Sequence, residues 1–220
     1  MTTGHRHEWG GISLILGPMM CGKSTELHRR VRRLRVAKVS CCVISHCANE
    51  RDGLTHSRTH DDFTLDLSGS FNSMEEFYTT YYTEALATPK PIQVVAIDEG
   101  QLFHDIEPWV TRLANEGVSV IIAACDRLVT GKPFGAVSQL VHNAEDILKL
   151  KAICALCQAD NAIFAQRRDI PLRQQFDPEE SARLSVVVTG GASLYMSVCR
   201  KCLVNRLQIE KEELNGTRSW

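Results

Sequence analysis

A glycine-rich segment near the N-terminus, Gly17-Pro-Met-Met-Cys-Gly22-Lys23-Ser24, has the spacing of a phosphate-binding loop (P-loop). Its glycines let backbone N–H groups turn toward phosphate oxygens, Lys23 adds a cation, and the Ser24 hydroxyl can ligate Mg²⁺. The segment lies between a strand-like run and a helical pattern, and a helix N-terminus favours anions. A plain glycine turn is the alternative, but it needs neither the lysine nor the serine. The segment therefore predicts nucleotide binding.

Two acidic residues, Asp98 and Glu99, follow the apolar run 92–97. In a P-loop enzyme, an aspartate at the end of such a strand holds Mg²⁺ directly or through water. The adjacent carboxylate can accept a proton from an attacking hydroxyl, so Glu99 is a candidate general base. Two acids in a solvated loop, or at the cap of the next helix, are the alternative. The nearby phosphate loop favours the catalytic interpretation.

Four of the nine cysteines form two Cys-x-x-Cys pairs, Cys154/Cys157 and Cys199/Cys202. Two such pairs can assemble a tetrahedral S₄ site, which is typical of structural zinc. The insertion between the pairs is long, so the metal is expected to hold the base of an extended loop. A redox dithiol pair or buried core cysteines are the alternatives. The remaining cysteines lie in or beside apolar segments and are expected to be free thiols: Cys21, Cys41, Cys42, Cys47 and Cys125.

Apolar runs alternate with helical patterns over the first 150 residues. The expected elements are a strand at 12–16, a helix from Lys23, a strand at 39–45, a helix at about 73–86, a strand at 92–97, a helix at 106–115 and a strand at 118–124. Such alternation predicts an α/β fold with a parallel sheet covered on both faces. The polar stretch 51–67 is expected to be a mobile hairpin or loop.

The character of the chain changes near residue 150, where helical pattern becomes scarce and the cysteine pairs begin. We therefore expect a nucleotide-binding α/β domain at 10–150, a zinc-binding domain at 151–205 and a polar tail at 206–220. The formal net charge of −1 argues against a dedicated nucleic-acid binder. No apolar run reaches the length of a membrane span, and the N-terminus lacks a signal-peptide pattern. The expected location is cytoplasmic.

These motifs occur in the same order in the type II (zinc-containing, cytosolic-type) thymidine kinases, which the chain resembles over about residues 10–205. GPMMCGKSTELHRRVRRL is similar to that family's phosphate loop and first helix, AIDEGQLF to its acidic segment, and GKPFG to a loop that follows a later strand. CALC, TGGASLY and CRKC together look like the family's zinc-anchored "lasso".

The resemblance implies a P-loop (RecA-like) parallel sheet with helices on both faces, plus a small zinc-anchored lasso domain. It implies ATP-dependent phosphorylation of the 5′-hydroxyl of thymidine, and also of deoxyuridine. Glu99 would be the general base, with Lys23 and Arg51 acting on the transferring phosphate. The ATP- and Mg²⁺-binding residues would be Gly17, Met19, Cys21, Gly22, Lys23, Ser24, Thr25 and Asp98. The nucleoside would be bound by Met19, Gln101, Leu102, Val129, Phe134, Thr189, Gly190 and Tyr195.

The resemblance also implies a homotetramer that serves nucleotide salvage for DNA synthesis and is inhibited by thymidine triphosphate. Four positions depart from the family pattern and bear on affinity: Asn49, Leu102, Val129 and Ala165. The main alternative is a P-loop ATPase whose zinc module binds single-stranded nucleic acid. A third interpretation, a nucleotide-binding regulator without catalysis, is disfavoured by the Asp98-Glu99 pair.

Overall fold

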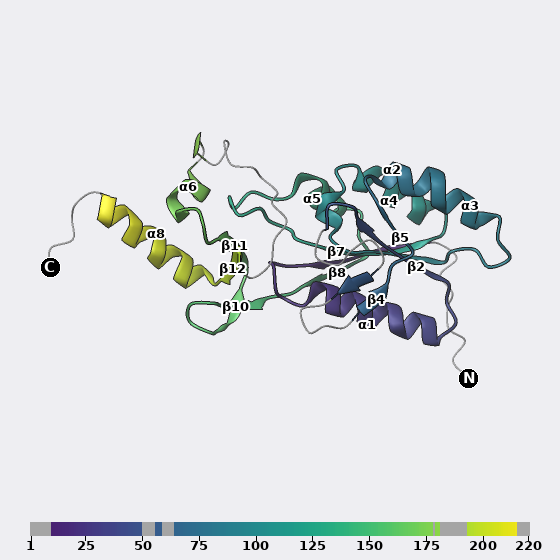
Figure 1. Cartoon of the computed structure of the whole chain (residues 1–220), viewed down its shortest axis with the longest axis horizontal. Coiled ribbons are helices and arrows are strands. Elements are labelled where there is room, and N and C mark those ends of the chain that lie inside the picture. Colours follow the sequence, from purple (N-terminus) through teal and green to yellow (C-terminus); the bar gives the residue numbers. More distant parts are fainter. Residues whose placement is uncertain (1–9, 50–55, 59–63, 178, 181–192, 215–220) are drawn as a thin grey trace.

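A computed structural model shows a central sheet with a smaller unit beside it (Figure 1). The structure describes residues 10–49, 56–58, 64–177, 179–180 and 193–214. Three of the predicted site residues lie outside the described residues: Arg51, Thr189 and Gly190.

The central sheet has six strands, and every neighbouring pair runs parallel. Its order is β5 (Gly69–Phe71), β2 (Cys41–His46), β6 (Val94–Ile97), β7 (Ser119–Ala124), β1 (Ile12–Leu16) and β8 (Asp146–Lys149). The four strands expected from the apolar runs are all present, with bounds that agree within two residues. The prediction of a parallel sheet is confirmed.

Helices cover both faces of the sheet, as predicted (Figure 1). They are α1 (Lys23–Val36), α2 (Met74–Glu76), the π-helix η1 (Phe77–Tyr82), α3 (Thr83–Leu86), α4 (Ile106–Asn115) and α5 (Gly135–Leu140). Alternate residues of a strand point to opposite faces. Leu14 accordingly joins the core beneath α4 and α5, whereas its neighbour Ile15 packs with Leu27 and Val31 of α1. Because both faces are buried, the strands read as continuous apolar runs.

The predicted helix at 73–86 is present but changes type along its length. The Ser73 hydroxyl caps it by accepting the backbone N–H of Glu76 at 3.0 Å. The Glu76 carboxylate accepts the N–H of Asn72 at 2.7 Å, one residue before the position that a capping box would use. The middle of the segment is the π-helix η1, in which Phe77 and Tyr82 are fully buried against the sheet.

The polar stretch after β2 contains an antiparallel pair, β3 (His56–Arg58) and β4 (Thr64–Asp66), which agrees with the expected hairpin.

A smaller unit, which we call the C-terminal module (residues 152–177 and 193–214), lies at one end of the sheet (Figure 1). Its elements are β9 (Ala152–Ile153), β10 (Asp160–Ala162), β11 (Phe164–Arg167), α6 (Leu172–Phe176), β12 (Tyr195–Val198) and α8 (Arg200–Leu214). The strands form two antiparallel pairs, β9 with β10 and β11 with β12. The module has its own core, in which Phe164, Met196 and Leu203 are buried. Helix α8 continues to Leu214, so residues 206–214 of the expected polar tail are helical.

Candidate active site

Three loops meet at the carboxyl-terminal edge of the sheet. They follow β1 (residues 17–24, the phosphate loop), β6 (residues 98–101) and β7 (residues 125–126). Strand β7 lies between β6 and β1, so the parallel strands deliver the three loops to one place. This is where open α/β sheets bind ligands.

The phosphate loop adopts a conformation that depends on its first and last glycines. Gly17 has φ 155°, and a Cβ there would lie 2.6 Å from the Cys21 sulfur and 2.8 Å from the Leu150 carbonyl oxygen. Gly22 has φ 86° and is the N-cap of α1, with no side-chain cap on that end. The N-terminus of this 14-residue helix thus borders the phosphate loop without a side-chain cap, and such a helix end favours anions.

Lys23 is buried at the start of α1, and its ammonium donates to the Pro18 carbonyl within the loop at 2.8 Å. Burial alone would lower the pKa of this lysine. Cys125, Cys21 and Glu99 lie close enough to reverse the effect, so its pKa lies above the ordinary value. Burial raises the pKa of the Cys125 thiol to about 11. The raised pKa of Lys23 keeps its ammonium protonated at neutral pH, so the loop offers a positive charge to a phosphate group.

Asp98 joins the phosphate loop to β6. The Ser24 hydroxyl donates to Asp98 Oδ1 at 3.0 Å, and the Glu99 backbone N–H donates to the same oxygen at 3.1 Å. Only 2% of Asp98 is exposed, so its carboxylate is fixed in place. A hydroxyl and a carboxylate oxygen are ligands that Mg²⁺ accepts, and their approach fits the Mg²⁺ site predicted from the two motifs.

Glu99 has an uncommon backbone conformation, with φ 53° in the left-handed region. Such conformations cluster at functional sites in proteins. The Gln101 side-chain amide donates from Nε2 to Glu99 Oε2, and its Oε1 accepts the Cys125 N–H at 2.9 Å. The predicted general base is thus linked to the loop after β7.

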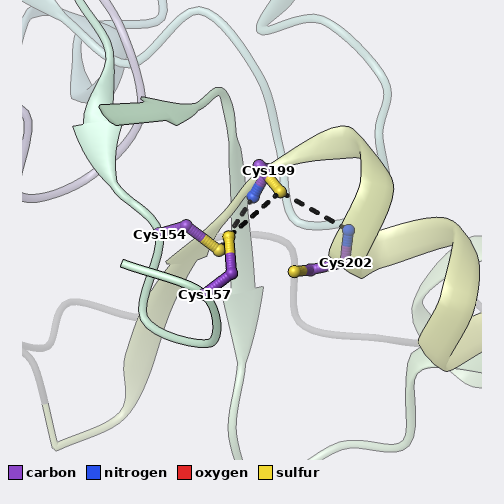
Figure 2. A group of neighbouring side chains, drawn as sticks. All are labelled: Cys154, Cys157, Cys199 and Cys202. Carbon is purple, nitrogen blue, oxygen red and sulfur yellow. Dashed lines mark hydrogen bonds between the residues drawn. The ribbon is translucent and has the colours of Figure 1, made fainter. Parts of the chain in front are cut away.

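The four predicted zinc ligands come together at the junction of β9, β12 and α8 (Figure 2). The sulfurs of Cys154, Cys157, Cys199 and Cys202 all lie within 4.8 Å of one another. A tetrahedral zinc with Zn–S bonds of about 2.3 Å has sulfur–sulfur edges of about 3.8 Å. The Cys157 and Cys199 sulfurs are 3.8 Å apart. The arrangement fits a structural zinc site.

Backbone amides support the same cluster. The Cys199 N–H donates to the Cys154 sulfur at 3.3 Å, and the Cys202 N–H donates to the Cys199 sulfur at 3.4 Å (Figure 2). Burial raises the pKa of Cys154, but backbone N–H groups of Cys157, Cys199 and Leu156 outweigh it and lower that pKa to about 6. A thiolate is the form that binds metal, so these amides favour metal binding.

The C-terminal module contacts the phosphate loop directly. The Ser197 hydroxyl of β12 donates to the Met19 carbonyl at 2.6 Å, and Cys21 packs against the core of the module. Beyond the phosphate loop, the Arg127 guanidinium stacks 5.0 Å from the centre of the Phe164 ring. No sequence motif predicts the contacts of Ser197 and Arg127, because each joins segments far apart in the chain.

The predicted nucleoside-binding residues lie on segments around the three loops. Met19 is half-buried in the phosphate loop, and Tyr195 is buried on the same face of β12 as Ser197. The other four described residues occupy the segments after β6 and β7: Gln101 and Leu102 in η2 (Gly100–Leu102), Val129 in the loop after β7, and Phe134 at the cap of α5. Their contact with a nucleoside stays a prediction.

The chain is similar to known proteins along most of its length. The profile of the family described as thymidine kinase matches residues 10–203. The chain is 37% identical to a thymidine kinase of Variola virus over 196 residues, which cover 89% of this chain and 98% of the relative. It is 38% identical to a thymidine kinase of Vaccinia virus (strain Copenhagen) and 37% to one of Raccoon poxvirus, with the same coverage. The chain belongs to the thymidine kinase family.

The four-cysteine cluster is consistent with the zinc-containing, type II thymidine kinases. The profile match includes the phosphate loop, the acidic pair and all four cysteines. Among the described helices, none combines the length and the apolar character that crossing a bilayer requires.

Proposed function

We propose that the chain transfers the γ-phosphoryl group of ATP to the 5′-hydroxyl of thymidine and so produces thymidine 5′-monophosphate for nucleotide salvage. The observation that carries this proposal is membership of the thymidine kinase family over residues 10–203. The phosphate loop, Asp98 and Glu99 at one edge of the sheet support it, because they supply the parts that phosphoryl transfer needs. Deoxyuridine, which has the same 5′-hydroxyl, is proposed as a second acceptor.

The phosphate groups of ATP bind to the backbone N–H groups at the start of α1 and to the Lys23 ammonium. Ser24 and Asp98 are the residues that would hold Mg²⁺, which neutralises phosphate charge when bound with ATP. Glu99 accepts the proton of the 5′-hydroxyl as the 5′-oxygen forms its bond to the γ-phosphorus. The bond from that phosphorus to the bridging oxygen breaks, and ADP leaves with its electron pair.

Thymidine is proposed to lie between the sheet edge and the C-terminal module. Met19, Leu102, Val129, Phe134 and Tyr195 enclose it. The Ser197 contact supports this arrangement, because it brings the Tyr195 face of β12 to the phosphate loop. Three further residues belong to the proposal through the family resemblance: Arg51 on the transferring phosphate, and Thr189 and Gly190 on the base.

Several wider features are proposed on the same family basis. Residues 10–150 form the nucleotide-binding domain and residues 151–205 a zinc-anchored lasso domain that closes over the base and excludes water. A bound zinc ion has a structural role. The active form is a homotetramer in the cytoplasm, and thymidine triphosphate inhibits it from the substrate site.

The direct test is phosphate transfer from labelled ATP to a panel of nucleosides with Mg²⁺, run with and without single-stranded DNA. We expect thymidine 5′-monophosphate as the main product and no effect of DNA. ATP hydrolysis that rises with DNA, with no nucleoside product, would overturn the proposal in favour of a nucleic-acid-dependent ATPase.

Ser197→Ala should raise the KM for ATP and for thymidine together, each by about 3- to 10-fold, because one net hydrogen bond to Met19 is lost. Steady-state kinetics measure both constants. Ser138→Ala is the matched control, because it removes a hydroxyl-to-carbonyl bond of 2.8 Å that stays within α5. Unchanged KM values in Ser197→Ala would show that the module does not position the phosphate loop.

A further inference from the structure

We propose that Gln101 is a positioning residue that holds the Glu99 carboxylate in the orientation needed for proton transfer. The inference deepens the proposed function and rests on Glu99 as the general base. It assigns Gln101 a role beside Glu99, in place of direct contact with the nucleoside.

The direction of the Gln101 amide follows from its partners. The backbone nitrogen of Cys125 can only donate a hydrogen bond, so the Gln101 atom 2.9 Å from it must be the oxygen, Oε1. The other end of the amide is then Nε2, a donor, and it faces Glu99 Oε2. A glutamine amide can usually be turned over without conflict, but here the backbone donor settles its direction.

The segment that carries Gln101 is held firmly against the sheet. Gly100 packs so closely on β7 that a Cβ there would lie 2.6 Å from Ile122 Cγ2. The Leu102 N–H donates to the Glu99 carbonyl at 2.9 Å and closes the turn. Cys125 follows directly after β7, which is the neighbour of β6. The Gln101 side chain therefore joins Glu99 to the end of the adjacent strand through a short, supported bridge.

This bridge has a chemical consequence for Glu99. A glutamate side chain has three rotatable bonds, and a general base must present one oxygen to the reacting proton. The Gln101 N–H engages Oε2 of the carboxylate and so limits the rotation of the Glu99 side chain.

The test uses Gln101→Met, which keeps the length of the side chain and removes both hydrogen bonds. We expect kcat to fall about 10- to 100-fold, with the dissociation constants of ATP and thymidine within about 3-fold of wild type. Gln139→Met, at an exposed position on α5, is the matched control and should leave kcat unchanged.

A double-mutant cycle separates this role from a structural one. On a Glu99→Gln background, adding Gln101→Met should cost no further turnover, because the amide acts only through the carboxylate. An equal loss in both backgrounds, a thymidine dissociation constant raised tenfold or more, or wild-type kcat in Gln101→Met would overturn the proposal. Gln101→Glu, which keeps the shape but cannot donate, should lose at least as much turnover if Gln101→Met fails to fold. Near-normal turnover of Glu99→Gln alone would instead remove the general base from the proposed function.

Discussion

Replacing Glu99 by glutamine should lower kcat for thymidine phosphorylation by about 10²- to 10⁴-fold, which is the usual contribution of a general base. Glutamine has the same shape and can occupy the same backbone conformation, but its amide cannot take the proton of the 5′-hydroxyl. Thymidine and ATP should bind within about 3-fold of wild type, because the proton moves only in the transition state. Steady-state kinetics give kcat, and titration calorimetry gives the two dissociation constants.

Glu84→Gln is the control for this experiment, because Glu84 is exposed on α3 and the substitution is chemically identical. It should keep wild-type turnover. A Glu99→Gln enzyme with near-normal kcat would exclude Glu99 as the base. A variant that lost thymidine binding along with turnover would show that the carboxylate binds the ground state as well.

The elements that support the site could be predicted because each is encoded locally. Strand β1 and helix α4 have the bounds expected from their apolar patterns, and the strand before Asp98 is shorter by two residues only. Strands β5 and β8 were not predicted. Strand β5 has three residues, and β8 is an edge strand whose Ile147 is 42% exposed, so neither forms a recognisable apolar run.

Some contacts of the candidate site could likewise be predicted from the sequence, and others could not. The contact of Ser24 with Asp98 could be expected, because each residue belongs to a motif with a known place at the sheet edge. The contact of Gln101 with Cys125 depends on how the turn after β6 sits against β7, and that of Ser197 with Met19 on how the module docks. Such geometry is set by tertiary packing and leaves no periodic signal in the sequence. The contacts of Gln101 and Ser197 therefore could not be predicted from the sequence.

Replacing Cys199 by serine should abolish stable zinc binding and unfold the C-terminal module. The Cys199 sulfur is buried, lies 3.8 Å from the Cys157 sulfur and accepts the Cys202 N–H, so its loss removes a ligand and an anchor of α8. The binding free energy of a structural zinc ion is of order 10 kcal/mol. The small hydrophobic core of the module cannot supply a stabilisation of that size. Thymidine affinity should fall by about 100-fold or more, because the module that contributes to the proposed thymidine site folds together with its metal.

ATP affinity should fall less, by about 3- to 10-fold, because the phosphate loop keeps its own sheet contacts and loses chiefly the hydrogen bond from Ser197. Elemental analysis of zinc per chain, hydrogen exchange across residues 152–214 and calorimetry with each substrate measure these effects. Cys47→Ser is the control, because Cys47 lies outside the cluster and the substitution is the same. One zinc per chain in Cys199→Ser would contradict the four-ligand site. Zinc loss with unchanged thymidine affinity would show that the metal and the nucleoside site are not coupled.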